Sequence, residues 1–393
     1  MTRHDPYNAF LDRPESPVSN ASAGKLAGLT LAVKDIFDIE GQRTGGGNPQ
    51  KLAEAEPAPR TATAIGRLLD AGARFVGRTQ TDELTFSLMG QNAHFPHPVN
   101  PAAPDRVTGG SSSGSAAAVA GGLADIAAGS DTGGSIRAPA SFCGLIGLRI
   151  THGAIPLAGA MPLAPTFDTF GWFAKDIATY ESVGEVLLGG SRTEPRRTLR
   201  LRALEDLLLG EAERAEYSRM AAVLASVLGD ARTAPTLSHS LDTLYMTFRR
   251  LQAYEAWAVH GAWISAADRK LGPGVGDRFA FGRELGCEVA TAETVTRSAF
   301  RDELAGLLGD DGVLVMPTVP GAAPFAASSF DAVQAYRERA LRMLCLSGLS
   351  GFPQITIPLG RVDGAPFGIS LLGPAGSDMA LIALARRVLA AAR

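Results

Sequence analysis

A run of glycine and serine from Thr108 to Ser115 leads without a break into a stretch of alanines. The run reads TGGSSSGS, and the residues that follow it, AAAVAGG, carry very little side-chain bulk. A Gly/Ser tract is often a flexible linker. One that continues directly into apolar residues instead favours a loop followed by a tightly packed helix, because small side chains let backbones approach closely. We therefore expect a packed loop and helix here.

Strand and helix patterns alternate on both sides of this segment. Residues 29–33 (LTLAV) alternate with a period of two, and a strand pattern over 73–79 (ARFVGRT) follows a helical stripe within 61–71. This rhythm predicts an α/β sheet and not a β-sandwich or a helical bundle. Later in the chain we expect strands at 312–318, 355–360 and 367–373 and a final helix at 377–393.

Residues 177–310 differ from the rest because amphipathic helical stripes dominate them, at 217–228, 251–264 and 295–308. Strand patterns occur both before and after this region. We therefore expect one discontinuous domain and not two independent ones. Its predicted parts are an N-terminal arm (1–24), a core (25–176), a variable helical region (177–310) and the C-terminal part of the core (311–393).

Charge and cysteine content exclude several classes of protein. The formal net charge of −3 offers no basic excess to neutralise a phosphate backbone, so no nucleic-acid partner is expected. The three cysteines are an odd number and lie far apart, which argues against a disulfide framework and for a reducing compartment. Neither a signal peptide nor a membrane-spanning run is visible. We expect a cytoplasmic protein without a membrane partner.

The sequence DTGGS at 131–135 combines a nucleophile with backbone donors. A hydrolase needs a nucleophile, a group that takes its proton, and donors for the developing oxyanion. Two glycines before Ser135 let successive N–H groups converge on one point. Alone the motif is weak, because Gly-Gly-Ser turns that bind nothing are common in loops.

Other site types fit the sequence poorly. No lysine follows either glycine cluster in the way a P-loop requires. Residues 110–114 match the G-x-S-x-G elbow formally, but the preceding segment is rich in proline and polar residues and predicts no strand. No HExxH or CxxC motif is present, so we expect neither a metal nor another cofactor.

The combined pattern resembles the amidase signature family. TGGSSSGSAAAVAGG (108–122) and AAGSDTGGSIRAPASFCGLIGLR (127–149) form an almost uninterrupted copy of its signature, and LAVKDIFDIEG (31–41) resembles its lysine-bearing strand end. SGFPQITIPLG (350–360) and DGAPFGISLLGP (363–374) also resemble family segments. The resemblance fails mainly across 177–310. It implies a single α/β amidase-signature domain, with a mixed central sheet covered by helices and a helical insertion in the second half.

By this resemblance the catalytic lysine is Lys34, the acylated serine is Ser135, and Ser111 is the bridging serine that takes part in a cis peptide bond. Glycine at position 110 makes Gly110–Ser111 a plausible place for such a bond. Ser112 adjoins the bridging position and is the alternative to Ser111.

The resemblance also assigns the oxyanion hole to the backbone amides of Thr132, Gly133 and Gly134, together with that of Ser135. Asp131 and Arg137 flank this turn. We expect both to hold the loop and not to contact substrate, because a charge beside a loop usually fixes backbone amides.

The chemistry of such a triad depends on the lysine. A lysine acts as a base near neutral pH only if desolvation or nearby cations lower its pKa. Lys34 ends an apolar strand, which favours burial. The hypothesis is that neutral Lys34 takes a proton from Ser111, which takes one from Ser135. The alternative is a salt bridge from Lys34 to Asp35 or Asp38.

The predicted reaction is hydrolysis of a small carboxylic amide to an acid and ammonia through a serine acyl-enzyme. KDIFD (34–38), TGGGNP (44–49) and GQNAHF (90–95) resemble indole-3-acetamide hydrolases, which suggests a small aromatic or acidic primary amide, for example an aryl- or indole-acetamide. The alternatives are a glutamine-hydrolysing amidotransferase subunit, a hydrolase of urea- or carbamate-type amides such as biuret or allophanate, and a non-catalytic docking domain. The expected partner is a small-molecule amide, and whether the protein forms a homodimer is left open.

Overall fold

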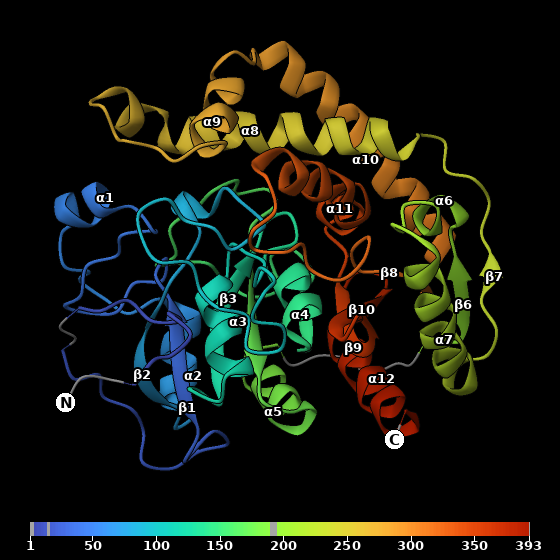
Figure 1. Ribbon diagram of the computed structural model, residues 1–393, viewed down its shortest axis with the longest axis horizontal. Coiled ribbons are helices and arrows are strands. Elements are labelled where there is room, and N and C mark those ends of the chain that lie inside the picture. Colours follow the sequence, from blue (N-terminus) through green and yellow to red (C-terminus); the bar gives the residue numbers. More distant parts are fainter. Residues whose placement is uncertain (1–3, 14–15, 189–194, 393) are drawn as a thin grey trace.

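The computed structural model describes residues 4–13, 16–188 and 195–392, and its helices surround a sheet in two sections (Figure 1). In the first section β1 is parallel to both β2 and β3, whereas β5 is antiparallel to β3. Its four strands lie in the order β2 (Arg74–Thr79), β1 (Thr30–Lys34), β3 (Ile126–Asp131) and β5 (Thr169–Ala174).

The second section contains six strands, and β4 packs beside β5 of the first. Neighbours β4, β9, β10 and β8 pair antiparallel, whereas β8, β6 and β7 pair parallel. One hydrophobic core spans both sections, so the predicted α/β class with a mixed sheet is confirmed. The order is β4 (Gly147–Arg149), β9 (Gln354–Val362), β10 (Ala365–Leu372), β8 (Gly312–Pro317), β6 (Arg197–Arg200) and β7 (Arg232–Thr233).

Helices cover this sheet in groups. One row, in which each helix contacts the next, comprises α2 (Thr63–Asp70), α5 (Ile177–Leu187), α12 (Asp378–Ala391) and α7 (Glu211–Leu228). α3 (Ser113–Ala120) packs on β3, and α4 (Arg137–Cys143) packs on β9 and β10. The short helices are α1 (Pro49–Glu54), the 3₁₀ turn η1 (Glu83–Thr85) and α6 (Arg202–Glu205).

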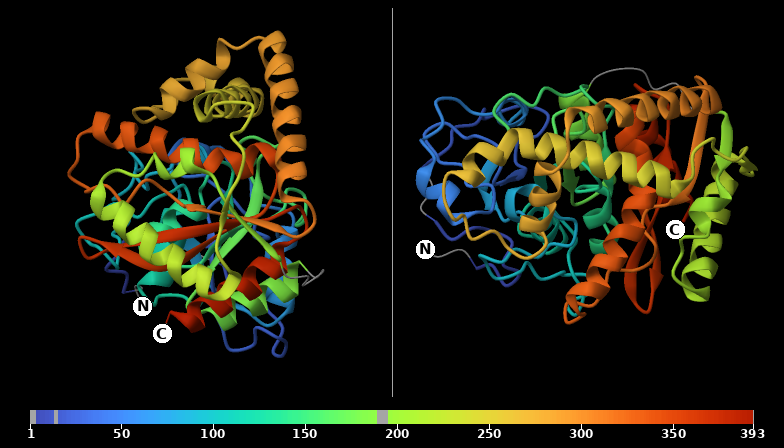
Figure 2. Two further views of the ribbon diagram at one scale, coloured as in Figure 1. Left: turned by 90° about the vertical axis from the view of Figure 1, so that its right-hand side faces the viewer. Right: turned by 90° about the horizontal axis from the view of Figure 1, so that it is seen from above.

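A further layer of long helices lies across the core, as Figure 2 shows. α8 contacts each of the other three helices in this layer. The layer contains α8 (Leu241–Ser265), α9 (Val275–Arg283), α10 (Cys287–Leu308) and α11 (Phe330–Ser350).

The predicted strands and long helices are present, but the region 177–310 also contributes β6 and β7 to the sheet. These strands were missed because they span only four and two residues and lack a clear period-two alternation. Parts of the predicted arm, at 1–3 and 14–15, and the last residue of the predicted final helix lie outside the described residues. Within the described arm, Phe10 forms a bridge with Thr79.

Parallel pairing of β1 and β3 brings two predicted site segments to one edge of the sheet. The register places Val33 opposite Ala128, so Lys34 comes close to the residues that end β3. α3 packs on the same strands, and its residues 113–119 are all buried. The prediction of a tightly packed helix after the Gly/Ser run is therefore confirmed, and its entry loop lies at the same edge.

Candidate active site

Lys34 is fully buried at the end of β1. Burial lowers its pKa to about 7, although the charges of Asp82, Asp131 and Asp168 act in the opposite direction. The predicted burial and lowered pKa are thus confirmed, and the alternative salt bridge to Asp35 or Asp38 is wrong. Asp35 instead pairs with Arg13 and Arg78.

Three serine hydroxyls surround the lysine amine. Lys34 Nζ donates to Ser111 Oγ at 2.8 Å, to Ser112 Oγ at 3.0 Å and to Ser130 Oγ at 2.9 Å. All three serines are buried. Ser130 was missed by the sequence reasoning, yet its position could have revealed it, because it is the last residue but one of β3, a strand parallel to the one that ends at Lys34.

Ser111 and Ser112 differ in what else they bind. The hydroxyl of Ser112 donates to the carbonyl of Ser130 at 3.2 Å and accepts from the N–H of Ser130 at 3.2 Å, so it is tied to β3. For Ser111 Oγ, the only hydrogen bond within the described residues is the one from Lys34. Of Ser111 and Ser112, Ser111 is therefore the one whose hydroxyl can form further hydrogen bonds, and the hydroxyl of Ser130 likewise binds only Lys34 among the described residues.

The predicted cis peptide bond between Gly110 and Ser111 is present. The neighbouring residue Asp82 was not anticipated. Its backbone N–H donates to the carbonyl of Ser111 at 3.1 Å, and its carboxylate accepts from the N–H of Gly90 at 3.0 Å. A β-carbon on Gly110 would lie 2.2 Å from Asp82 Oδ2, so only glycine fits there.

Ser135 lies between β3 and α4, in a loop that Asp131 holds. The buried carboxylate of Asp131 accepts from the backbone N–H groups of Gly134 and Ile136, at 2.8 and 3.1 Å. It also pairs with Arg137 at 2.9 Å and with Arg149 at 3.1 Å, both of which are fully buried. Asp131 and Arg137 thus contact the loop as predicted, whereas Arg149 was missed.

Burial alone would raise the pKa of Asp131. The charges of Arg137 and Arg149, with the hydrogen bonds of Arg137 and Ile136, instead hold that pKa well below its usual value. Asp131 is therefore ionised throughout the neutral range. Since the carboxylate binds both the loop amides and two guanidinium groups, it acts as the anchor of the nucleophile loop.

The amide of Gly134 is the one predicted oxyanion donor that the structure does not support. Its N–H already donates to Asp131 Oδ1, so it is not available to a substrate oxygen. The positive φ of +128° at Gly134 and a contact of 2.5 Å between a hypothetical β-carbon and Leu344 explain why glycine stands there. Among the described residues no hydrogen bond uses the N–H of Gly133 or Ser135.

Thr132 is held by Asp168. The hydroxyl of Thr132 donates to Asp168 Oδ1 at 2.6 Å, while Oδ2 accepts from the N–H groups of Leu163 and Ala164 at 2.8 and 3.1 Å. Burial raises the pKa of Asp168 to about 6, and the hydrogen bond from Thr132 opposes this rise. The role of Asp168 had no local sequence signal, because it lies 36 residues from Thr132.

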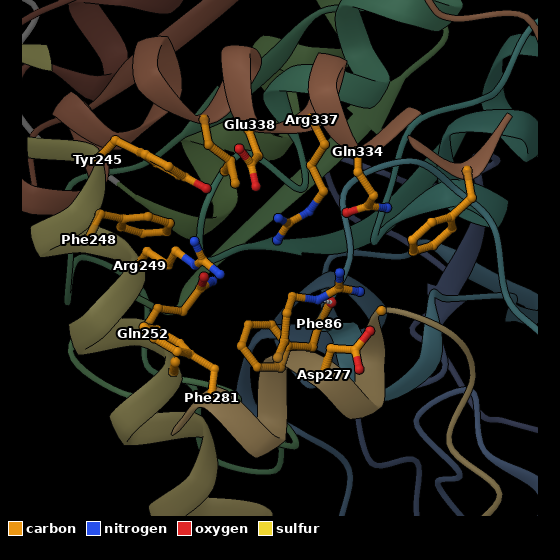
Figure 3. A pocket seen from close by; sticks show the side chains of 15 residues that line it. Phe86, Tyr245, Phe248, Arg249, Gln252, Asp277, Phe281, Gln334, Arg337 and Glu338 are labelled. Carbon is orange, nitrogen blue, oxygen red and sulfur yellow. Dashed lines mark hydrogen bonds between the residues drawn. The ribbon is translucent and has the colours of Figure 1, made fainter. Parts of the chain in front are cut away.

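Ser135 itself lines a small recess together with Thr85, Gly133 and Leu88. The recess shares four residues with a larger cavity between α8, α9 and α11, whose side chains Figure 3 shows. The shared residues are Phe86, Gln252, Arg337 and Leu341. The recess of the candidate nucleophile therefore adjoins a chamber large enough for a substrate group.

The amidase family model matches residues 10–212. The chain is also 39% identical to Amidase 1 of Arabidopsis thaliana, over 98% of each sequence, and 36% identical to Amidase 1 of Oryza sativa, over 96% of this chain and 93% of that one. The chain belongs to the amidase family. A crystal structure of an amidase, 29% identical, superimposes on this amidase with a TM-score of 0.83 and covers 93% of this chain and 85% of that one.

Membership in the family makes this chain an amide hydrolase. Within the described residues no helix is both long and apolar enough to cross a membrane. The same part of the chain contains no group of three or more histidine, cysteine or acidic side chains placed to hold a metal ion.

Proposed function

We propose that this amidase hydrolyses a small primary carboxylic amide to an acid and ammonia, with Ser135 as nucleophile and Lys34 as base. The observation that supports this most strongly is the contact of 2.8 Å between a buried lysine amine of lowered pKa and the hydroxyl of Ser111. At a pKa of about 7 a large fraction of Lys34 is neutral at neutral pH. A neutral amine carries a lone pair that can accept a proton from Ser111.

In the first half of the reaction Ser135 Oγ attacks the amide carbonyl carbon. Ser111 takes the proton of Ser135 and passes its own to Lys34. The amides of Gly133 and Ser135, with that of Thr132, bind the negative oxygen. Such donors each contribute roughly 10²–10³ in rate. The proton then returns through Ser111 to the leaving nitrogen, the C–N bond breaks, and ammonia leaves an acyl ester on Ser135.

In the second half water attacks the ester with the same relay as base, so that the acid is released and Ser135 is regenerated. Neither half of the reaction requires a metal or an organic cofactor, since Lys34 and Ser111 relay each proton that leaves Ser135 or water and each proton that the leaving nitrogen or Ser135 receives. The division of the chain into an arm, core and helical region, a cytoplasmic location and a homodimeric state remain predictions.

The test is a panel assay for ammonia release. Indole-3-acetamide, phenylacetamide, glutamine, biuret and a simple carbamate are each incubated with the wild type and with Ser135→Ala. We expect release from carboxamides by the wild type only. Preferential release of ammonia from glutamine would favour a glutamine-hydrolysing amidotransferase subunit, and preferential release from biuret or the carbamate would favour a hydrolase of urea- or carbamate-type amides. Neither result would change the proposed triad. No release from any amide would contradict the proposal and favour a non-catalytic docking domain.

A further inference from the structure

The chamber beside Ser135 has a volume of about 170 Å³. A cavity of about 150 Å³ is known to hold benzene, so the chamber has room for a ring or a short chain. Its aromatic walls include Phe86, Phe248 and Phe281. When a primary amide is cleaved, only ammonia leaves, so the acyl part needs a space of its own near Ser135, and this chamber offers one.

Three arginines from three helices line the same chamber: Arg249 of α8, Arg278 of α9 and Arg337 of α11. We call them the arginine cluster. In Figure 3 the guanidinium groups of Arg249 and Arg337 approach the same central space from different helices. Arg249 lies over the ring of Phe281 at 4.6 Å, and Arg278 Nε donates to the carbonyl of Phe86 at 2.6 Å, so both groups are oriented by their surroundings.

Within the described residues none of these arginines forms an ion pair. Arg337 is only 8% exposed, and its Nε has no hydrogen-bond partner there. Two acidic side chains also line the chamber, namely Asp277, which is exposed, and Glu338, which is half-buried. Neither carboxylate lies within ion-pair distance of the cluster, and three positive charges against two negative ones leave an excess of one.

Burial disfavours the positive charge of two members of the cluster. Burial lowers the pKa of Arg337, and burial together with the charge of Arg337 lowers that of Arg278. A buried charge without a partner is costly, and an anion placed between such groups removes the cost. Guanidinium groups bind carboxylates in particular, through paired N–H···O bonds.

We propose that the arginine cluster binds a carboxylate of the substrate, so that the preferred substrate is a primary amide whose acyl part carries a second, free carboxylate. This inference rests on the proposed function, because it assigns the far end of the same substrate. The aromatic walls contact the carbon skeleton between the two ends. Gln252 and Arg337 both line the recess that contains Ser135 as well as the chamber.

The experiment compares matched substrates that differ only in charge. Succinamate is paired with 4-oxopentanamide, and 4-carboxyphenylacetamide with 4-acetylphenylacetamide. For the wild type we expect kcat/KM to be at least tenfold higher for each carboxylate. Arg337→Met should lower kcat/KM for the carboxylates by roughly 10- to 100-fold, the usual value of a charge-assisted hydrogen bond, and change it little for the neutral partners.

Arg249→Met, on a different helix, should have the same selective effect and guards against a folding defect in Arg337→Met. Arg283→Met, an exposed arginine of α9 that does not line the chamber, is the matched control and should leave the preference unchanged. A wild type that prefers the neutral amides, or cluster variants that weaken both classes equally, would overturn the inference.

Calorimetric titration of Ser135→Ala with the same four compounds separates this inference from the proposed function. We expect tighter binding of the carboxylates, weakened by added salt. If the wild type cleaves no amide but Ser135→Ala still prefers the carboxylates, the proposed function fails and the anion site stands. If cleavage occurs but binding shows no preference for charge, the anion site fails alone.

Discussion

Lys34 Nζ lies 2.8 Å from Ser111 Oγ at a place where neither side chain is exposed beyond 1%. The amine makes a similar contact with Ser112, at 3.0 Å. Ser112, however, is also bonded to the backbone of Ser130 in both directions. Lys34 thus contacts Ser112, which is fixed to β3, and Ser111, whose hydroxyl has no other hydrogen-bond partner among the described residues.

The lowered pKa of Lys34 predicts how activity depends on pH. The reaction needs the neutral amine, so kcat/KM should rise with pH, pass its midpoint near the lysine pKa of about 7, and level off above it. The measurement is kcat/KM for a neutral amide between pH 5 and 9. A profile that is flat from pH 5 upward would show that no group with this pKa must lose a proton.

Asp82 should set the position of that midpoint. Its carboxylate is the charge that most strongly raises the pKa of Lys34. In Asp82→Asn the amine loses this stabilisation of its charged form, so the midpoint of kcat/KM should move to lower pH. Asparagine can still accept the N–H of Gly90. Asp70→Asn, at an exposed position at the end of α2, is the control and should not move the midpoint. A shift to higher pH in Asp82→Asn would contradict the electrostatic account.

The two neighbouring serines should respond differently to loss of the hydroxyl. Ser111→Ala should lower kcat by roughly 10²–10⁴, the usual contribution of a proton-transfer group. Ser112→Ala should retain most activity but lower the free energy of unfolding by about 1–3 kcal/mol, because the buried N–H of Ser130 loses its acceptor. Steady-state kinetics and urea unfolding of both variants decide the matter, and the reverse pattern would assign the relay to Ser112.

Asp131 should be essential for the stability of the folded protein as well as for the conformation of the nucleophile loop. Asp131→Asn removes the charge that compensates Arg137 and Arg149, and breaking such a buried pair costs about 3–5 kcal/mol. Asp311→Asn breaks an ion pair with Arg197 in which both partners are well exposed, and should cost less than about 1 kcal/mol. Denaturant unfolding at pH 7 compares the two variants. Equal losses would mean that Asp131 does not anchor the buried arginines.

Local sequence patterns were sufficient to locate those site residues whose position depends on a single segment of the chain. The apolar alternation before Lys34 predicted a buried strand end, and the DTGGS turn located Ser135. The resemblance assigned the amide of Gly134 to the oxyanion hole, which the structure does not support, since a glycine pattern does not show which amide a carboxylate occupies. β6 was missed because its pairing with β8 depends on backbone contacts more than 100 residues away in sequence and not on its own side-chain pattern.

The arginine cluster was beyond sequence reasoning for a related reason. Arg249 lies just before the stripe predicted at 251–264, and no helix was predicted where α11 carries Arg337. Their meeting point depends on how α8 and α11 pack on each other, which periodicity does not specify. Arg149 and Asp168 likewise reach the nucleophile loop from later segments of the core.

The central claim is that Lys34, through Ser111, activates Ser135. The most direct test is intact-protein mass spectrometry and peptide mapping after reaction with a fluorophosphonate, with the rate followed for the wild type, Lys34→Met and Ser135→Ala. The account predicts a single adduct on Ser135, formed at least about a hundredfold more slowly in Lys34→Met and absent in Ser135→Ala. An adduct on another residue, or labelling of Lys34→Met at the rate of the wild type, would contradict it.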